Sequence, residues 1–486
     1  MAERTASTDR VVGDVPAPGP DEGTLAKVAL ALADWSERWF PDALIFAMAA
    51  VVVVAVGALA LGAPPRIVMI QFGKGFWDLI PFTMQMALII VGGYVVASSP
   101  PVARLIESLA TLPRTGRGAV AYIALLSMLT SMISWGFSLV FSGLLVREIA
   151  RRLPRLDYRA AGAAAYLGLG SIWALGLSSS AAQLQANRAS LPPALLKITG
   201  VIPFTETIFL WQGLATALIL LVVSVAVAYR SAPSDALARP ASTFGLRFEP
   251  MRSDLEPRTR PGEWLEYSPL LTILIAILAV GWVGSTFSTL GPMTAIANLN
   301  TYNFIFLTLG LLLHWRPRRF LHAVGAAVPA TAGVLVQFPF YASIAAILTG
   351  AKGTGDVTLS DWLAQIFVSV SNEHTFPLLV SAYSAILGLF VPSGGGKWVI
   401  EGPYVMQAAN TLQVHLGWVV QIYNTAEALP NLVNPFWMLP LLGILGVKAR
   451  ELVGYTILQV IVHTPIVFFL MWLFARTLIY HPPVLP

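Results

Sequence analysis

Residues 391–397 have the types and spacing that could bind an anion. They read Val-Pro-Ser-Gly-Gly-Gly-Lys and lie between two apolar stretches. Pro392 ends any helix arriving from the first stretch, and the glycines leave backbone polar groups without side-chain cover. Such a backbone survives inside a membrane only where protein buries it or where it lines a wet cavity. The next helix begins near Lys397, so its unpaired N–H groups face the break. This stretch predicts the anion-binding tip of a re-entrant helical hairpin.

Lys397 and Glu401 are the charged residues that follow this tip. A cation in the first helical turn opposes the helix dipole and costs ~2.5–3.5 kcal/mol near the membrane centre. A substrate carboxylate resting on the amides of residues 393–396 would offset both effects. The alternatives are that Lys397 reaches the external surface or pairs with Glu401 one turn later. Glu401 is correspondingly either a proton-coupling group or a permanent counter-ion, because burial favours the neutral carboxyl.

Short polar side chains at other predicted breaks complete the candidate site. Serine and asparagine oxygens suit Na⁺ coordination or substrate hydrogen bonds, and they equally suit local backbone capping and helix packing. The candidate substrate-binding residues are Ser134, Ser178, Ser179, Ser180, Ser393, Gly394, Gly395, Gly396, Lys397 and Asn434. The candidate coupling residues are Glu401 and Asn431. The residues that could hold Na⁺ are Ser178, Ser179, Asn431 and Asn434. We expect no cofactor beyond a coupling ion, Na⁺ or H⁺.

The composition limits the classes of protein that these residues can belong to. The chain has 486 residues, 56% hydrophobic and 11% charged, whereas soluble domains carry about 25% charged residues. This composition predicts a polytopic membrane protein, and arginines on cytoplasmic loops explain the net charge of +5 better than nucleic-acid binding does. The glycine-lysine run is no P-loop, because Trp398 follows the lysine and Val391 replaces the first glycine. HExxH and GxSxG motifs are also missing from the sequence, so we expect no enzyme.

The elements that must position the candidate site follow from hydropathy and arginine placement. We expect a cytoplasmic tail and an interfacial amphipathic helix over 1–41, a first repeat over 42–229, a cytoplasmic linker over 230–264, and a linking span with a second repeat over 265–486. The expected spans are 43–61, 76–97, 160–186, 205–228, 265–286, 302–315, 322–348, 416–442 and 452–475. Residues 118–146 predict a hairpin that enters from the cytoplasm, because arginines flank both its ends. Residues 350–375 are expected to be a polar external segment, and 376–410 a hairpin that enters from outside.

The two halves have the same order of features with opposite orientation. Each contains spans, a hairpin with a serine at its tip, an interrupted span and a closing span. The interruptions fall at 176–180 and 429–435. Paired breaks in inverted repeats indicate the midplane site of a secondary transporter. The expected fold is therefore an all-α polytopic membrane protein of about nine spans, an inverted-repeat bundle with two opposed re-entrant hairpins and broken transmembrane helices.

One longer motif resembles a known family. Residues 390–407, Phe-Val-Pro-Ser-Gly-Gly-Gly-Lys-Trp-Val-Ile-Glu-Gly-Pro-Tyr-Val-Met-Gln, resemble the signature of the bacterial short-chain fatty acid transporters. That family includes the permease that accompanies acetoacetate and butyrate degradation. Arg-Trp-Phe-Pro-Asp at 38–42 and Leu-Gly-Leu-Ser-Ser-Ser-Ala at 175–181 agree with it, so the resemblance covers about residue 30 to the C-terminus. Gly402 stands where a larger small residue such as alanine is expected. The family is similar to the wider ion-transporter group of inverted-repeat carboxylate carriers.

The resemblance implies a secondary active transporter of small monocarboxylates such as acetoacetate or butyrate, working by alternating access. Glu401 favours coupling to H⁺, and the serine and asparagine breaks favour Na⁺. Arginine placement predicts a cytoplasmic N-terminus in a bacterial inner membrane, and related carriers suggest a homodimer. The residues alone predict only a carrier of a small organic anion. One intramembrane cation without an arginine pair favours one negative charge over a C4-dicarboxylate or citrate. An anion channel is the alternative from another class.

Overall fold

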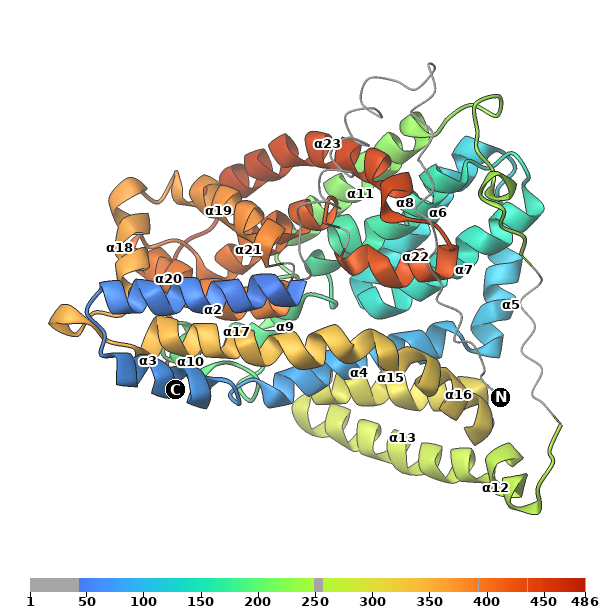
Figure 1. Cartoon of the computed structure of the whole chain (residues 1–486), viewed down its shortest axis with the longest axis horizontal. Helices are drawn as coiled ribbons and strands as arrows, with labels where there is room; N and C mark the ends of the chain where they lie inside the picture. The colour runs from blue at the N-terminus through green and yellow to red at the C-terminus, as the bar shows by residue number, and fades with distance from the viewer. Residues whose placement is uncertain (1–42, 249–256, 392, 435, 486) are drawn as a thin grey trace, which may run out of the picture.

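A computed structural model describes residues 43–248, 257–391, 393–434 and 436–485, and in this part of the chain it is helical throughout (Figure 1). The strand-type pairing of these residues is a single bridge between Lys352 and Thr358. The amphipathic helix expected before residue 42 lies outside the described residues. Seven helical segments of the described chain are long and apolar enough to cross a membrane: Ile80–Ala97, Gly116–Ile133, Tyr158–Ala186, Trp211–Ser231, Pro261–Leu290, Pro317–Gly350 and Ala449–Ala475.

Most helices of the first half coincide with the stretches expected from hydropathy, and three short helices, 65–75, 100–109 and 193–199, lie between those stretches. In order, they are α2 (Ala43–Ala60), α3 (Pro65–Gly75), α4 (Ile80–Ala97), α5 (Pro100–Leu109), α6 (Gly116–Ile133), α7 (Trp135–Arg152), α8 (Tyr158–Leu167), α9 (Ser180–Ala186), α10 (Pro193–Thr199) and α11 (Trp211–Ser231). Helices α6 and α7 pack together as a hairpin, which confirms that the 118–146 stretch bends back on itself.

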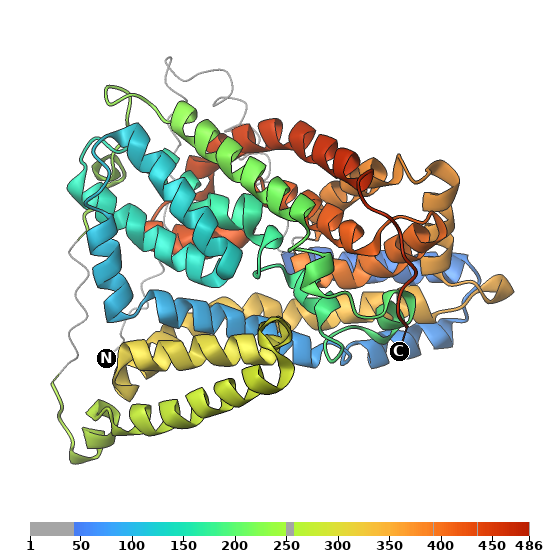
Figure 2. The ribbon, with the colours of Figure 1, turned by 180° about the vertical axis from the view of Figure 1, so that it is seen from behind.

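The second half continues after the linker and contains a second hairpin, formed by α19 and α20. Its helices are α12 (Trp264–Tyr267), α13 (Leu270–Leu290), α14 (Pro292–Ala297), α15 (Leu299–His314), α16 (Pro317–Ala327), α17 (Ala332–Gly350), α18 (Leu359–Val370), α19 (Phe376–Phe390), α20 (Gly394–Thr411), α21 (Leu416–Asn431), α22 (Leu439–Leu445) and α23 (Ala449–Ala475). Helix α13 lies at the edge of the bundle in both views (Figure 2), and 17% of its apolar window is buried. Its outer face is therefore an apolar surface suited to lipid.

The segment expected to be polar and external, 350–375, is only partly so. It contains α18 (Leu359–Val370), which packs against α20. Thr358 caps this helix, since its side chain accepts a hydrogen bond from the Asp361 amide while Asp361 bonds back to the Thr358 amide. The helix has 12 residues, too few for a span of about 20 residues, so hydropathy does not mark it as a span. The same holds for α5, which has 10 residues.

Packing contacts recur in the two halves. Helix α5 lies against α7 as α18 lies against α20, and α6 lies against α8 as α19 lies against α21. The halves also interlock, because α2 packs on α17 while α4 packs on α15. In both views the α6–α7 hairpin and the α19–α20 hairpin approach the centre from opposite ends (Figures 1 and 2). The described chain is thus one helical bundle built from two similar sets of elements.

The two hairpin tips have nearly the same backbone geometry. Ser134 has φ −151° and ψ 115°, and Ser393 has φ −148° and ψ 102°. Each serine is the N-cap of the helix that follows it, and its hydroxyl oxygen accepts a bond from the amide three residues later, that of Phe137 or Gly396. An extended serine at this position ends one helix and starts the next, so each hairpin turns within a very short segment.

Each half also contains a broken helix. After α8 the chain passes through a π-helical turn (Gly168–Ile172) and a 3₁₀ turn (Trp173–Leu175) before Gly176 becomes extended. Ser179 then caps α9 by accepting from the Ala182 amide. The second broken helix is α21, which ends at Asn431 and is separated from α22 by an irregular stretch. Both breaks fall where the serine run and the Asn-Pro run predicted them.

Candidate functional site

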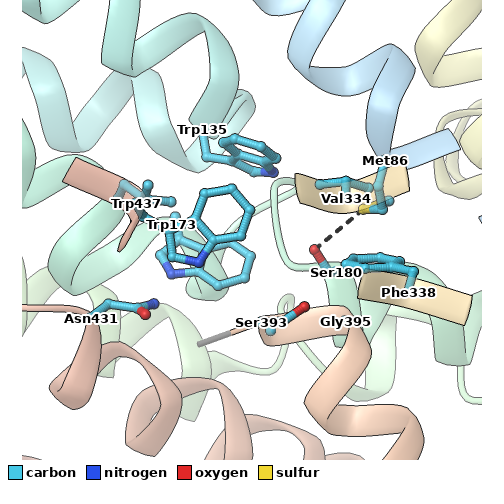
Figure 3. Close-up of a pocket in the computed structure, with 12 residues that line it drawn as sticks. Met86, Trp135, Trp173, Ser180, Val334, Phe338, Ser393, Gly395, Asn431 and Trp437 are labelled. Carbon is cyan, nitrogen blue, oxygen red and sulfur yellow. Dashed lines mark hydrogen bonds between the residues drawn. The ribbon is translucent and has the colours of Figure 1, made fainter. Parts of the chain in front are cut away.

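A small pocket lies where the two hairpin tips meet the two broken helices (Figure 3). It is lined by Met86, Trp135, Leu169, Trp173, Ser180, Val334, Phe338, Ser393, Gly394, Gly395, Asn431 and Trp437. The pocket holds ≈ 370 Å³ of atom-free space, part of which is open to solvent, and ≈ 20 Å³ is open to the centre of a water-sized molecule. Since one water needs about 10–15 Å³ by this measure, the pocket in this conformation has room for one or two waters, and a larger ligand requires its walls to move apart.

Four of the lining groups can form hydrogen bonds with a small ligand. The first amides of α20, on Gly394 and Gly395, precede any intrahelical partner. The Ser393 hydroxyl accepts from Gly396 N–H at 3.2 Å, which leaves its own hydrogen free to donate. The Asn431 side chain is 1% exposed, and neither its Nδ2 nor its Oδ1 has a partner among the described residues. A buried amide without partners is costly, so this arrangement points to a polar ligand.

The remaining wall of the pocket is apolar and aromatic. Trp135 begins α7 and its ring packs against that of Trp437, whereas Trp173 lies in the 3₁₀ turn of the first broken helix and its ring lies against Gly394 (Figure 3). Met86, Val334 and Phe338 close another side from α4 and α17. Among the described residues, no charged side chain lines this space. The pocket therefore offers one polar side and one apolar side.

The glycines of the tip allow the close approach that shapes this pocket. A Cβ added to Gly394 would overlap the Trp173 ring, and one added to Gly395 would overlap the ring of Phe82. Any other residue at these positions would have to push a buried aromatic ring aside. The glycine run therefore lets aromatic rings lie directly against the start of α20.

A fully buried cluster of charged side chains lies one helical turn behind the pocket. The Nζ atom of Lys397 is 2.8 Å from Oε2 of Glu427 and 3.4 Å from Oε2 of Glu401. It also donates to the Ser384 carbonyl at 2.8 Å and lies 4.4 Å from the ring centroid of Tyr423. All three charged side chains are 0% exposed. One ammonium group thus faces two carboxyl groups, and the cluster would carry one excess negative charge if all three were ionised.

The charged cluster and the pocket share helices. Lys397 lies on α20 one turn after Ser393, and Glu427 lies on α21 one turn before Asn431. Residues four apart on a helix occupy the same face. Tyr423 connects the two helices, since its hydroxyl donates to the Gly394 carbonyl at 2.5 Å while its ring lies near Lys397. A change of charge in the cluster can therefore affect the pocket, because one helical turn of α20 and one of α21 join the two sites.

The serine and asparagine side chains outside the pocket form hydrogen bonds within the protein. The Ser178 hydroxyl accepts from the Trp135 amide at 2.7 Å, which joins the first broken helix to the first hairpin tip. The Ser179 hydroxyl caps α9 and donates to Oδ1 of Asn424 at 3.0 Å. Asn434 donates to the Leu389 carbonyl at 3.3 Å. These side chains hold the tips and breaks in place.

The structure divides the predicted site residues into three groups. The residues that line the pocket are Ser180, Ser393, Gly394, Gly395 and Asn431. The residues whose side chains cap or connect the breaks are Ser134, Ser178, Ser179 and Asn434. Lys397 and Glu401 belong to the buried cluster, and Gly396 lies between the two sites and bonds to Ser393. Pocket and cluster are therefore separate sites one turn apart.

Sequence reasoning missed Glu427 and the tryptophans that line the pocket. Glu427 is an ionisable residue inside an apolar stretch, and such residues are functional candidates by default; this signal could have identified it. No comparable signal marks Trp135 or Trp173, because aromatic residues are common throughout membrane helices.

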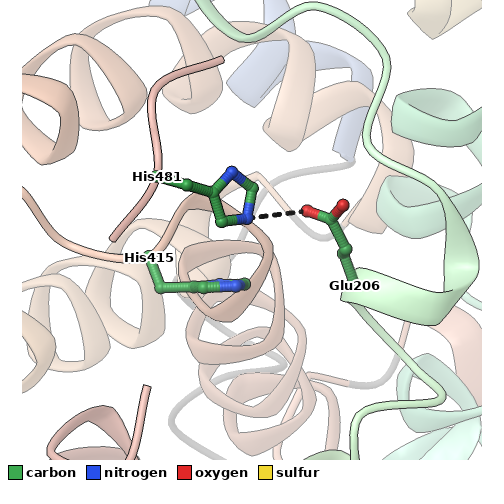
Figure 4. Close-up of side chains that lie close together, drawn as sticks. All are labelled: Glu206, His415 and His481. Atoms are coloured by element: carbon green, nitrogen blue, oxygen red, sulfur yellow. Dashed lines mark ion pairs between the residues drawn. The ribbon is translucent and has the colours of Figure 1, made fainter. Parts of the chain in front are cut away.

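A second group of ionisable side chains lies apart from the pocket (Figure 4). Nε2 of His481 is 3.2 Å from Oε2 of Glu206, and His415 completes a group whose potential ligand atoms lie within 4.8 Å of one another. Nδ1 of His415 accepts from the Trp418 amide at 3.1 Å. A neutral ring that accepts at Nδ1 carries its proton on Nε2, so His415 is a hydrogen-bond donor here and not a free metal ligand. Burial, and to a smaller degree the charge of His481, lower the pKa of His415 against the opposing effect of Glu206.

The fold and the pocket together define a class of protein. A helical membrane bundle in which two hairpin tips and two broken helices surround a small site is the architecture of a membrane transporter. The crystal structure of the Alcanivorax borkumensis YdaH transporter is similar in fold, with a TM-score of 0.57 and 14% sequence identity. The match covers 90% of this chain and 98% of that one.

Two bacterial proteins, each named as an inferred short-chain fatty acid transporter, are similar to this chain along nearly its whole length. The Escherichia coli (strain K12) protein is 36% identical over 436 residues, which are 89% of this chain and 96% of the relative. The Haemophilus influenzae (strain ATCC 51907 / DSM 11121 / KW20 / Rd) protein is 32% identical over 456 residues, or 91% and 98% of the two chains. The sequence profile described as "Short chain fatty acid transporter" matches residues 24–474. The chain belongs to the short-chain fatty acid transporter family and is an integral membrane protein, which confirms the relationship indicated by the glycine-lysine motif.

Proposed function

We propose that this chain is a secondary active transporter of short-chain monocarboxylates such as acetoacetate or butyrate. It works by alternating access and couples substrate movement to a cation, H⁺ or Na⁺. The observation that carries the proposal is the two-sided pocket, which offers unpartnered amides on one side and aromatic or aliphatic side chains on the other. A short fatty acid has the matching division into one carboxylate and one apolar tail.

In the proposed binding mode the carboxylate rests against the first amides of α20. Gly394 and Gly395 supply N–H donors, and the positive end of the helix dipole favours an anion there. The Ser393 hydroxyl and the Asn431 amide are the side-chain donors. The tail lies against Trp135 and Trp173. This arrangement binds the anion by hydrogen bonds and leaves the Lys397 ammonium in its buried cluster.

A single carboxylate fits this pocket better than two. A dicarboxylate needs a second set of donors, for which bidentate arginine is the usual solution. The apolar side of the pocket provides aromatic and aliphatic side chains instead. A C4-dicarboxylate carrier is therefore the second candidate, and an anion channel the third.

The proposal includes an orientation in the membrane. Arginines at the ends of α7 and in the linker favour a cytoplasmic location for these segments and for the N-terminus in a bacterial inner membrane. The α6–α7 hairpin would then enter from the cytoplasm and the α19–α20 hairpin from outside, both as re-entrant elements. A homodimer is part of the proposal through the family resemblance, and its test is the native mass in detergent.

Substrate transport could be coupled to Na⁺ through an ion bound at one of the helix breaks. The Ser178 and Ser179 hydroxyls and the Asn434 amide already bond within the protein, and Asn431 is the candidate with unpartnered polar atoms. A Na⁺ ion at the second break would use the Asn431 oxygen. An imposed Na⁺ gradient in the transport assay tests this version directly.

The testing experiment is counterflow of labelled butyrate in proteoliposomes that are preloaded with unlabelled butyrate. It is run at about pH 8, far above the range in which carboxyl groups titrate, because the neutral acid crosses bilayers without a protein. Protein-free liposomes give the background rate. We expect transient accumulation of label in proteoliposomes, competed by acetoacetate and not by succinate.

The matched variants are Asn431→Leu and Asn410→Leu. Asn431 faces the pocket, whereas Asn410 bonds to the Ile198 carbonyl and to Tyr480 outside it. We expect the first variant to raise the KM for butyrate and the second to leave KM unchanged. Competition by succinate would indicate a dicarboxylate carrier. Flux without any counterflow would indicate a channel and refute the proposal.

A further inference from the structure

We propose that Glu427 binds the coupling proton, one per transport cycle, so that monocarboxylate transport is electroneutral H⁺ symport. This inference rests on the proposed transport function and adds to it the identity of the coupling ion and its site. The observation behind it is the buried cluster of Lys397, Glu401 and Glu427.

Charge balance in the cluster calls for one additional positive charge. The ammonium group of Lys397 neutralises one of the two carboxylates that it contacts at 2.8 and 3.4 Å. All three side chains are 0% exposed, so water cannot screen the second carboxylate. An uncompensated buried charge is strongly unfavourable. A proton on one carboxyl group removes the excess charge without any further residue.

The hydrogen bonds around the two carboxyl groups place this proton on Glu427. Glu401 accepts from the Ser384 hydroxyl and lies one turn from Lys397 on the same helix, so two neighbours stabilise its ionised form. Glu427 has the Lys397 ammonium 2.8 Å from its Oε2, but among the described residues no hydroxyl or amide group donates to either of its oxygens. Hydrogen bonds to a carboxylate favour its charged form, and Glu427 is therefore the easier group to protonate.

The surroundings of Glu427 contain the groups that tune this proton. Lys397 and Glu401 face it from α20, and Tyr423 faces it from its own helix. Tyr341 of α17 lies within electrostatic range. The near side of α19 is Gly388, where an added Cβ would lie 3.0 Å from Oε2 of Glu427. Lys397 is thus the cation that favours ionisation of both carboxyl groups, and each carboxylate opposes ionisation of the other.

The position of Glu427 relative to the pocket explains how its protonation can favour binding of the substrate anion. Glu427 lies one turn before Asn431, and Lys397 lies one turn after Ser393. An ionised Glu427 gives the cluster a net negative charge close to the site of the substrate carboxylate, and the two anions repel. Protonation removes the repulsion, so the carrier binds proton and substrate together and releases them together.

The experiment compares two assays on the full-length protein in liposomes. The first is butyrate counterflow at equal pH on both sides. The second is the initial rate of butyrate uptake driven by an acid exterior, with protein-free liposomes subtracted. The variants are Glu427→Gln, Glu401→Gln and the surface control Glu373→Gln, whose side chain is 60% exposed.

We expect Glu427→Gln to keep counterflow and to lose the stimulation by the pH gradient, because its neutral side chain allows substrate binding without a proton. Glu373→Gln should match the wild type in both assays. Gradient-driven uptake that persists in Glu427→Gln would overturn the inference. The reverse pattern, with stimulation lost in Glu401→Gln and kept in Glu427→Gln, would assign the proton to Glu401 and also overturn it.

A measurement on the wild type alone covers the case in which Glu427→Gln fails to fold. One proton per monocarboxylate moves no net charge, so a K⁺ diffusion potential set with valinomycin should leave protein-dependent uptake unchanged. Uptake that follows the potential, or that requires Na⁺, would refute the inference while the transport function stands. Absence of any protein-dependent counterflow in the wild type would instead refute the proposed function itself.

Discussion

Replacing Lys397 with methionine would test whether its ammonium group stabilises the fold by neutralising one of the two buried carboxylates. Methionine has a similar length and no charge, so the variant leaves Glu401 and Glu427 buried without the ammonium group that both contact. With one carboxyl group already neutral, folding of the variant requires a proton on the other as well. The loss of stability then equals the free energy needed to protonate that carboxyl group at the pH of the experiment.

The magnitude follows from the titration of glutamate in the unfolded chain, near pH 4.3. Protonating one such carboxyl group at pH 7 costs about 3.7 kcal/mol, at about 1.36 kcal/mol per pH unit. The same step costs about 1 kcal/mol at pH 5. The value at pH 7 agrees with the roughly 3–5 kcal/mol lost when one partner of a buried ion pair is removed. Because the folded variant binds one proton more at this pair than the folded wild type does, its deficit relative to the wild type shrinks as the pH falls.

The assay is equilibrium unfolding in mixed detergent micelles at pH 7 and pH 5. The control is Lys352→Met, which breaks a 2.6 Å pair between Lys352 and Asp356 whose side chains are 55% and 77% exposed. Exposed pairs of this kind contribute about 0–1 kcal/mol, so the control should stay close to the wild type at both pH values. A Lys397→Met protein that is as stable as the wild type at pH 7, or whose deficit is the same at pH 5, would refute the reasoning.

Other side chains of the site give predictions of their own. Gly394→Ala adds a methyl group that overlaps Trp173, and overpacking of this kind costs about 1–3 kcal/mol. Counterflow should fall by about 5- to 150-fold, whereas Gly443→Ala, which meets open space, should transport like the wild type. Trp173→Ala should enlarge the apolar side of the pocket and shift competition from butyrate toward hexanoate. The pKa of His415 is lowered in the fold, so as the pH falls below about 6.5 this histidine takes up a proton in the unfolded chain before it does so in the folded protein. Protonation therefore favours unfolding, and amide-exchange protection at Trp418 should fall from pH 7 to pH 5. His415→Asn should remove this pH dependence.

The amino-acid sequence by itself determined the helical class and the positions of the breaks. Long apolar stretches can satisfy their backbone inside a bilayer only as helices, so the spans were predictable from composition. The breaks were predictable because their causes are local. Ser134 and Ser393 cap the helix that follows them through a bond to an amide three residues away, and a chemical signal of that range is visible in the sequence.

The glycine-lysine motif also showed which segment forms the site, but not which of its residues face the pocket and which belong to the buried charged cluster. Local rules assign Lys397 and the glycines to one anion site, since they are adjacent in the sequence. In the fold the first amides of α20 face the pocket, while the Lys397 side chain points back to Glu427 on α21. Adjacent residues on a helix point about 100° apart, and the neighbouring helix decides which of them meets the pocket.

Only the tertiary structure decided the partners that lie on different helices. Lys397 and Glu427 are 30 positions apart, and their contact depends on how α20 and α21 pack along their length. The same holds for Trp173, which reaches Gly394 from the other half of the chain. Packing register between helices has no periodic signature in a single sequence, because a deeply buried helix has no solvent-facing side to set its period. Local backbone chemistry therefore fixed where the chain breaks, and helix packing fixed which residues face one another across those breaks.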